Sequence, residues 1–312
     1  LLGGLPLYSH LVYHRSLAAT TLVWQFHKNA FTTEEEFTEY LGSKRVLNLQ
    51  AYTIPEEAEL TVPFVHTRYG GIPFYVLNGA ADPEAPVIFY FPGGSYIDQP
   101  TASHWTFLDT LAADTGAAVY VPIYPKLPDH TAQDSLTALQ SAYNGIVGGM
   151  VHGDVIFMGD SAGGGLALSL AMQLRDRGDT GPDKLILICP WVDVTMENPD
   201  IASYEAKDKL LDRTMLHRLG ALWAGDLPAD DPAVSPLYGD LSGLGDVTLF
   251  TTTGEILYPD LMLLYDKLMD SGNDCTLITP EGTLFHTWPL YASLGVPESE
   301  TACEEILTAV SR

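Results

Sequence analysis

The sequence predicts an α/β fold in which helices cover both faces of a mostly parallel sheet. Short apolar runs recur along the chain, and each fits a buried parallel strand. Helical patterns separate most of these runs, and strands that alternate with helices form parallel sheets. The apolar runs are 87–91, 117–123, 155–158, 185–189, 247–252 and 275–279, and the helical patterns are 103–113, 132–146, 166–174 and 258–269.

Residues 1–60 are expected to be helical and partly separate from the rest of the chain. A capping-box pattern, in which a threonine stands three residues before a glutamate, begins a helix with one apolar face. The pattern consists of Thr32 and Thr33 before Glu35 and Glu36, and the apolar face consists of Phe37, Tyr40 and Leu41.

Residues 61–312 are expected to form the main domain. Its first part is a pair of strands over 62–77, which turns at Gly70 and Gly71. The insert 192–244 is polar, rich in Asp and Pro, and helical in part, so we expect it to contribute peripheral helices.

The charge of the chain excludes two classes of partner. Its 40 acidic and 15 basic side chains give a formal net charge of −25, which repels nucleic acid and anionic membrane. No apolar run reaches the roughly 20 residues that span a bilayer, so we expect no membrane span. The first residues lack the charged front of a signal peptide, although a removed leader stays open.

The cysteines favour a reducing compartment. Cys189, Cys275 and Cys303 stand singly in apolar or helical contexts and show no metal-ligand spacing. His10 and His14 have an i, i+4 spacing that a metal could use, but no third ligand stands with them. We therefore expect a cytoplasmic protein without a metal or any other cofactor.

The stretch MGDSAGGG at 158–165 has the pattern of a nucleophile elbow. It follows an apolar run and precedes a helical pattern. Gly159 and Gly163 flank Ser161 at positions where a side chain would collide with the neighbouring strand or helix. We expect the Ser161 hydroxyl to project from this turn at the positive end of a helix. The alternative is a solvated serine in a turn of small residues.

A nucleophilic serine needs an acid and a base, which in this type of fold follow it in the order serine, acid, histidine. His286 lies on a loop after the last apolar run, whereas His217 stands within a helical pattern, so we expect His286 to be the base. Glu255 directly follows the run 247–252 and is the expected acid. Asp260 is the alternative acid. However, an acidic residue in the first turn of a helix is already explained by its favourable interaction with the positive end of the helix dipole.

A turn after the run 87–91 can supply hydrogen-bond donors for an oxyanion. In PGGSY at 92–96, Gly93 and Gly94 lack a Cβ and are free to aim their N–H groups into the site. Together with the N–H of Ala162, these donors would stabilise a tetrahedral intermediate by roughly 3 kcal/mol each.

Residues near this turn and the base are candidates for lining a pocket. They are Gly93, Tyr96 and Trp288, and core packing explains the two aromatic rings equally well. Asp134, four residues after His130, is expected to cap or brace a loop rather than to touch substrate.

Several motifs occur together in the chain. They are GDSAGG at 159–164, PGGS at 92–95, PWVD at 190–193, SPL at 235–237, GEILYPD at 254–260 and HTWPL at 286–290. Together they resemble the hormone-sensitive lipase family of α/β-hydrolase carboxylesterases, over most of the chain from residue 62 onward. The resemblance implies an α/β-hydrolase fold, a lid or cap built from the N-terminal helices, short-chain carboxylester substrates, and a triad of Ser161, Glu255 and His286. The usual acid of the family is Asp, and Glu is a longer substitute that some relatives share.

The oxyanion loop departs from the HGGG motif of that family. The second and third glycines of the motif supply the oxyanion donors, which implies Gly94 and Ser95 in this chain. Pro92 replaces the histidine and Ser95 replaces the last glycine. Neither change removes a donor N–H at those positions, but Pro92 alters what anchors the loop.

Two classes of function fit these observations. The first is a serine carboxylesterase that hydrolyses short-chain acyl esters through an acyl-enzyme, or an amide or formamide hydrolase that uses the same triad. The second is a non-catalytic binding protein with a hydrolase fold. The complete set of serine, acid and histidine favours the enzyme. Its partner would be a small-molecule ester, and a homodimer stays open.

Overall fold

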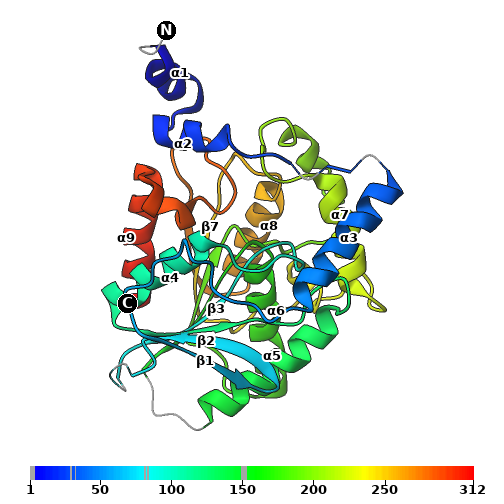
Figure 1. The fold of residues 1–312 in the computed structure, drawn as a ribbon, viewed down its shortest axis with the longest axis vertical. Helices are drawn as coiled ribbons and strands as arrows, with labels where there is room; N and C mark the ends of the chain where they lie inside the picture. The colour runs from blue at the N-terminus through cyan, green and yellow to red at the C-terminus, as the bar shows by residue number, and fades with distance from the viewer. Residues whose placement is uncertain (1–3, 29, 32, 81, 83, 149–152) are drawn as a thin grey trace.

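The computed structural model describes residues 4–28, 30, 31, 33–80, 82, 84–148 and 153–312. The strands in this part of the chain are β1 (Phe64–Tyr69), β2 (Ile72–Leu77), β3 (Val87–Phe91), β4 (Ala118–Pro122), β5 (Val155–Asp160), β6 (Lys184–Ile188), β7 (Asp246–Phe250) and β8 (Asp274–Ile278). They form one sheet in the order β1-β2-β4-β3-β5-β6-β7-β8. β2 pairs antiparallel with β1 and β4, and the other neighbours pair in parallel, which confirms the mostly parallel sheet (Figure 1).

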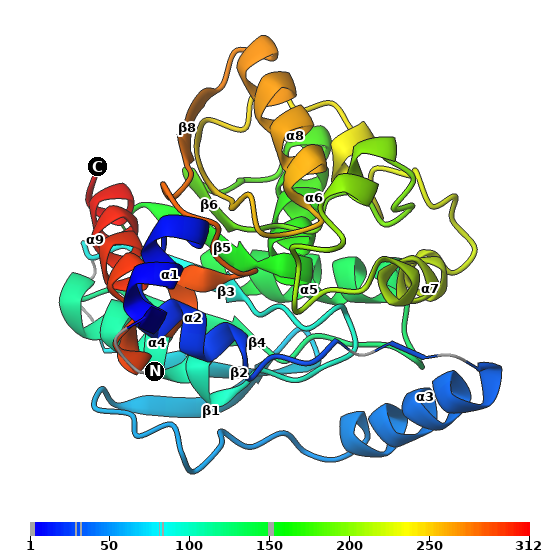
Figure 2. The ribbon, with the colours of Figure 1, turned by 90° about the horizontal axis from the view of Figure 1, so that it is seen from above.

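The sheet buries side chains on both of its faces. In β3, Val87, Phe89 and Phe91 join the apolar core on one face, whereas Ile88 and Tyr90 join the core on the other. This division follows from the two-residue period of a strand, and because both faces are covered the whole strand is apolar. The first face is covered by α5 (Ala132–Val147), α6 (Ser161–Arg177) and α8 (Tyr258–Asp270), and the second by α4 (Ala102–Thr115) and α9 (Pro297–Ser311) (Figure 2).

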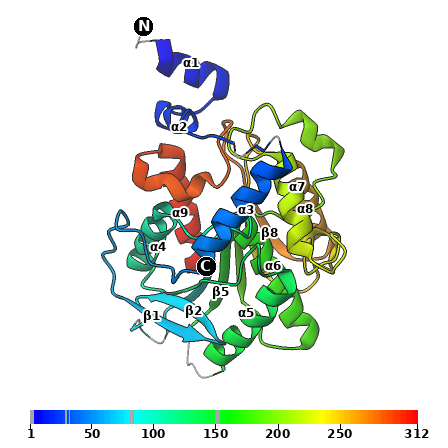
Figure 3. The ribbon, with the colours of Figure 1, turned by 45° about the vertical axis from the view of Figure 1, so that its right-hand side comes forward.

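The N-terminal segment contains α1 (Gly4–Tyr13), α2 (Leu17–Val23) and α3 (Glu34–Asn48). The expected capping box is confirmed for Thr33 and Glu36, whereas Thr32 lies outside the described residues. α1 and α2 stand together at one end of the molecule, and α3 lies apart from them (Figure 3). The division into a lid over 1–60 and a catalytic domain over 61–312 stays a prediction.

The helical expectation for residues 1–60 is wrong for their last part. Residues 49–63 form neither helix nor strand. Pro55 and Pro63 lack the N–H that a helix interior needs. A prediction from the spacing of apolar and polar residues alone does not take this missing hydrogen-bond donor into account.

Two helices begin or occur where the sequence analysis does not expect them. α6 begins at Ser161 rather than at residue 166. Its start contains three successive glycines, 163–165, which are poor helix formers, but a Cβ on Gly164 would contact Pro190 at 2.8 Å, so close packing requires the small residues. α9 is absent from the expected helices, although Pro297 at its start and the acidic residues of its first turn are typical of a helix N-terminus.

The insert 192–244 contributes α7 (Arg213–Ala224) and two short 3₁₀ helices, 199–203 and 236–238. Met215, Leu219 and Trp223 of α7 lie buried in the same core as α5 and α6. No helix in the described ranges is long and apolar enough to cross a membrane.

Candidate active site

Ser161 lies at the junction of β5 and α6, at the carboxyl edge of the sheet. Its φ of 52° is in the left-handed region, which costs energy for a residue that carries a Cβ. Gly163 must lack a side chain, because a Cβ there would overlap the carbonyl oxygen of Phe91 at the end of β3. The junction is therefore a strained strand-to-helix turn that holds the hydroxyl at the N-terminus of α6.

His286 lies between Ser161 and Glu255. The Ser161 hydroxyl donates to His286 Nε2 at 2.8 Å, and His286 Nδ1–H donates to Glu255 Oε2 at 2.5 Å. Because a carboxylate can only accept, this second contact assigns the proton to Nδ1 and leaves the Nε2 lone pair facing the hydroxyl. The exposed fractions are 8% for Ser161, 3% for His286 and 0% for Glu255. Such an arrangement can take a proton from the serine as its oxygen attacks an acyl carbon.

Glu255 is held by the chain that follows β7. Its Oε1 accepts hydrogen bonds from the Thr251 hydroxyl at 3.1 Å and from the Thr252 N–H at 3.3 Å. The alternative acid, Asp260, lies instead in the first turn of α8, where its Oδ1 accepts from Asn198 at 2.7 Å. Burial raises the pKa of Asp260 to about 7. Of the two candidate acids, Glu255 is the one that contacts His286.

Three carboxylates act on the charge state of His286. Burial lowers the pKa of this imidazole, but the hydrogen bond and charge of Glu255 and the charges of Asp208 and Asp160 outweigh burial, so the pKa lies above its ordinary value. The imidazolium that forms when the base takes a proton is therefore stabilised.

Sequence reasoning missed Asp208, a buried carboxylate behind the base and acid. Its Oδ2 accepts from the N–H of Ile256 at 2.9 Å, and its Oδ1 accepts from Leu210 and Leu211 at 2.8 and 2.9 Å. Burial raises the pKa of Asp208, although these N–H groups oppose that rise. Asp208 thus joins the insert to the chain beside Glu255. The sequence around Asp208 gives only a weak signal that this residue caps the turn before Leu210. No sequence pattern connects Asp208 with residue 256.

Sequence reasoning also missed the position of Cys189. This residue directly follows β6 with a φ of 46°, and it is fully buried. Its sulfur and the ligand atoms of Glu255 and His286 lie within 4.8 Å of one another. Burial and the charge of Glu255 raise the pKa of the thiol well above its ordinary value. These residue types could hold a metal, but the 2.5 Å hydrogen bond between His286 and Glu255 fits an acid and base pair.

The loop after β3 contains Gly94 and Ser95, whose N–H groups are the predicted oxyanion donors. Gly94, Ser95 and Tyr96 have φ values of 117°, 52° and 61°, so three successive residues are in left-handed conformations. Among the residues that the structure describes, none accepts a hydrogen bond from the N–H groups of Gly94, Ser95 or Ala162. The expectation that Gly93 donates into the site is wrong, because its N–H donates to Asp160 Oδ1 at 2.9 Å. Gly93 therefore anchors the loop.

Asp160, the last residue of β5, holds this loop against the sheet. Besides the N–H of Gly93, it accepts from the Tyr90 hydroxyl at 2.7 Å and lies 3.3 Å from His104 Nε2. Burial alone would raise the pKa of Asp160, but His104, Tyr90 and Gly93 hold it below its ordinary value. A charged carboxylate thus supports the loop in a chain where Pro92 stands in place of the histidine of the HGGG motif.

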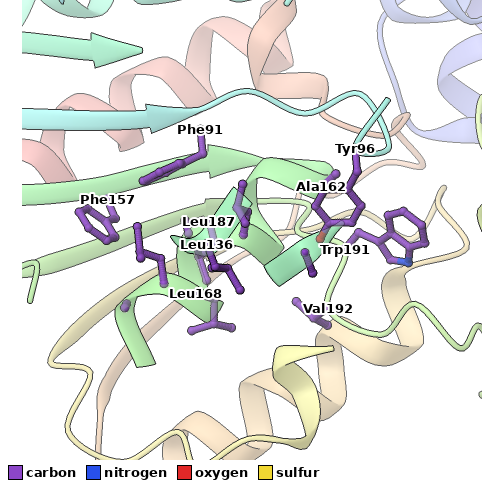
Figure 4. Packing of buried hydrophobic residues seen from close by; sticks show 14 of the residues in the cluster. Phe91, Tyr96, Leu136, Phe157, Ala162, Leu168, Leu187, Trp191 and Val192 are labelled. Carbon is purple, nitrogen blue, oxygen red and sulfur yellow. The ribbon is translucent and has the colours of Figure 1, made fainter. Parts of the chain in front are cut away.

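The two aromatic candidates for the pocket are packed in the core. Tyr96 is 1% exposed and stacks on Trp223 and Trp191 with ring-centroid distances of 4.0 and 5.3 Å. Figure 4 shows Tyr96 beside Ala162 and Trp191. Trp288 is 3% exposed and packs against Phe250 at 6.3 Å. Of the two roles left open for these rings, the structure favours packing.

Asp134 and the pair of His10 and His14 lie outside the site. Asp134 forms a capping box with Thr131 at the start of α5, so the expected capping role is confirmed. The rings of His10 and His14 lie 6.4 Å apart, and neither belongs to a metal-type cluster among the described residues.

Known proteins resemble the chain over most of its length. A family described as alpha/beta hydrolase fold matches residues 88–289. An acetyl-hydrolase of Streptomyces hygroscopicus is 31% identical over 219 residues, which cover 70% of this chain and 72% of that protein. A triacylglycerol lipase of Mycobacterium tuberculosis is 29% identical over 243 residues, which cover 72% of this chain and 49% of the lipase. The chain thus spans about half the length of that relative.

Solved structures share the fold. A structure from Staphylococcus aureus superposes with a TM-score of 0.86 over 95% of this chain and 99% of that chain, at 25% identity. A hormone-sensitive lipase from a metagenome library superposes with a TM-score of 0.74 over 94% of this chain and 95% of that chain, at 24% identity. These superpositions extend beyond the matched residues 88–289 into the N-terminal segment, because they cover more than nine-tenths of the chain.

Proposed function

Because this chain belongs to the alpha/beta hydrolase fold family, we propose that it is a serine carboxylesterase that hydrolyses short-chain acyl esters through an acyl-enzyme intermediate. Membership of the family confirms the hydrolase class that the sequence predicts. The observation that carries the proposal is the chain of hydrogen bonds from Ser161 through His286 to Glu255.

In the proposed reaction, His286 acts first as a base and then as an acid. Its Nε2 takes the proton of Ser161 as the serine oxygen attacks the ester carbonyl. The N–H groups of Gly94, Ser95 and Ala162 would then stabilise the oxyanion of the tetrahedral intermediate. His286 gives the proton to the leaving alcohol, and water repeats the sequence to release the acid. Throughout, Glu255 holds the imidazole in the required tautomer and stabilises its charged form.

The acyl length in this proposal has support from a relative. The Streptomyces protein that is 31% identical to the chain is named an acetyl-hydrolase. A panel of p-nitrophenyl esters from acetate to palmitate, with an aryl formamide added, tests this choice and the amide alternative together. We expect the highest kcat/KM between acetate and butyrate. A maximum at laurate or longer would contradict the short-chain proposal, and faster turnover of the formamide would favour an amide hydrolase.

The nucleophile is tested by Ser161→Ala. Removing the attacking oxygen should abolish ester turnover while the fold is retained, because alanine keeps the backbone and Cβ of serine and loses only the hydroxyl. The matched control is Ser169→Ala on the same helix, where the lost hydrogen bond to Pro232 costs about 1 kcal/mol of stability but no activity. Esterase activity that survives Ser161→Ala in a preparation free of other esterases would refute Ser161 as the nucleophile and the acyl-enzyme proposed to form on it.

A further inference from the structure

We propose that the cavity between α2 and the turn 206–209 binds an anionic amphiphile, namely a carboxylate with an apolar tail. The cavity has a volume of about 510 Å³. Small-molecule sites typically have volumes of about 300–1,000 Å³. In the part of the chain that the structure describes, its lining contains neither Ser161, His286 nor Glu255, so the cavity is a site apart from the proposed active site.

The body of the cavity is apolar and partly open to solvent. Val12 and Trp24 line it and are 50% and 58% exposed. Val23 and Phe26 line it as well. Large apolar side chains that gather around one cavity, rather than singly on a surface, mark a binding site for an apolar group.

The rim of the cavity is basic, in contrast to the rest of the molecule. Lys207 and Lys209 line it and are exposed, and Arg15 lines it as a buried side chain that donates to Thr20 and Thr283; no lining residue among those described is acidic. These are three of only 15 basic residues in a chain with 40 acidic ones. Cations concentrated at one opening of an acidic protein draw an anion to that opening.

The rim lysines keep hydrogen-bonding capacity for a ligand. Lys207 lies over the Tyr204 ring at 4.7 Å, and Lys209 donates to the carbonyl of Ala206 at 2.8 Å. An ammonium has three donors, so each of these contacts leaves donors unused.

The acidic groups near the rim are engaged elsewhere. Asp208 is buried between the two lysines and accepts from three backbone N–H groups. Glu298 accepts from Ser16, and Glu205 lies 3.5 Å from Arg213. Because the charge of Glu298 also acts on Arg15, an incoming carboxylate would be met chiefly by Lys207 and Lys209.

The cavity shares a wall with the loop that carries His286. Phe26 packs against Phe285 with a ring-centroid distance of 5.2 Å. Thr283 lines the cavity and donates its N–H to the carbonyl of Tyr13 at 2.9 Å. An occupant would contact the segment just before the base without entering the site of the chemistry.

Calorimetric titration of the full chain carrying Ser161→Ala tests the proposal with sodium decanoate and decanol. Because this variant has no proposed nucleophile, the result does not depend on the esterase proposal. We expect saturable binding of decanoate that is about tenfold tighter than that of decanol, since only decanoate makes charge-assisted hydrogen bonds. Replacing both lysines, Lys207→Gln with Lys209→Gln, should weaken decanoate about fivefold and leave decanol unchanged. Trp24→Ala should weaken both ligands.

The matched control is Lys267→Gln, which removes an exposed lysine on α8 that does not line this cavity. It should leave decanoate binding unchanged. The proposal is overturned if decanoate shows no saturable binding, if decanol binds as tightly as decanoate, or if the lysine double variant binds decanoate like its parent.

Discussion

The two sides of Ser161 are held by different kinds of contact. On the base side, His286 contacts the fully buried Glu255, and Asp208 lies behind them. On the oxyanion side, the loop 93–96 presents backbone N–H groups, and the buried carboxylate of Asp160 holds this loop at Gly93. On the base side a buried carboxylate thus contacts the reacting side chain itself, whereas on the oxyanion side a buried carboxylate holds the backbone next to the donors.

The difference follows from the chemistry that each side must perform. A base that becomes cationic during the reaction is helped by nearby carboxylates that are already in place. Oxyanion donors must instead remain unpaired until the intermediate forms, so a support that bonded to them would remove them from the reaction. Asp160 accordingly takes the N–H of Gly93 and leaves those of Gly94 and Ser95 open.

The largest expected effect comes from breaking the base side at Glu255. Glu255→Gln keeps the shape of the side chain but permits the wrong imidazole tautomer, so kcat should fall by on the order of 10³ to 10⁴. Asp260→Asn is the matched control, because it changes a buried acid that contacts Asn198 rather than His286. Steady-state kinetics with p-nitrophenyl butyrate measures both. The opposite ranking of the two variants would transfer the role of the acid to Asp260.

The second effect comes from loosening the oxyanion side at Asp160. Asp160→Asn weakens the contacts with Gly93 and His104, so we expect kcat to fall by roughly tenfold to a hundredfold, less than for the loss of a donor itself. The free energy of unfolding should fall by about 1–3 kcal/mol. Kinetics and urea denaturation measure the two losses.

Asp109→Asn is the control for this variant. Asp109 is a buried carboxylate that accepts from Thr61 and Val62, away from the oxyanion loop. It should lose a similar stability and keep its kcat. If both variants lost activity equally, the effect of Asp160 would be one of general stability.

The third prediction concerns the base side and uses the pH dependence of kcat/KM. The raised pKa of His286 means that kcat/KM increases with pH as the imidazolium loses its proton, above the ordinary histidine value. Asp208→Asn removes one of the charges that raise this pKa, so the acidic limb should move to lower pH. Glu255 and Asp160 still face the ring, so the pKa should stay above that of an imidazole without these carboxylates. The plateau kcat should stay within about tenfold of the parent, since Asn can still accept from Ile256. A lower plateau without a shifted limb would indicate a purely structural role.

The smallest effect is expected at the outer support of the oxyanion loop. Lys44 of α3 pairs with Asp98, and the two side chains are 22% and 36% exposed. Exposed pairs contribute about 0–1 kcal/mol, so Lys44→Gln should change the free energy of unfolding within that range, and less at high salt. Arg45→Gln, which breaks the neighbouring exposed pair with Asp129, should behave alike. A loss of activity in Lys44→Gln beyond about twofold would mean that α3 holds the loop more firmly than an exposed pair can.

The sequence by itself determined the sheet, the elbow and the order of the candidate triad. These features are local, because an apolar run, a glycine beside a serine and a histidine after a strand each depend on neighbouring residues. Even so, local patterns misplaced the start of α6, where glycines serve packing against Pro190 and Trp191 rather than helix propensity.

Only the tertiary structure decided how the site is supported. It brought Glu255 rather than Asp260 to His286, made Gly93 an anchor rather than a donor, and placed Asp208 behind the base. The contact between Asp160 and Gly93 joins residues 67 positions apart, and that between Asp208 and Ile256 joins residues 48 apart. No periodicity within one segment encodes such pairs, because their geometry depends on how strands and insert pack together.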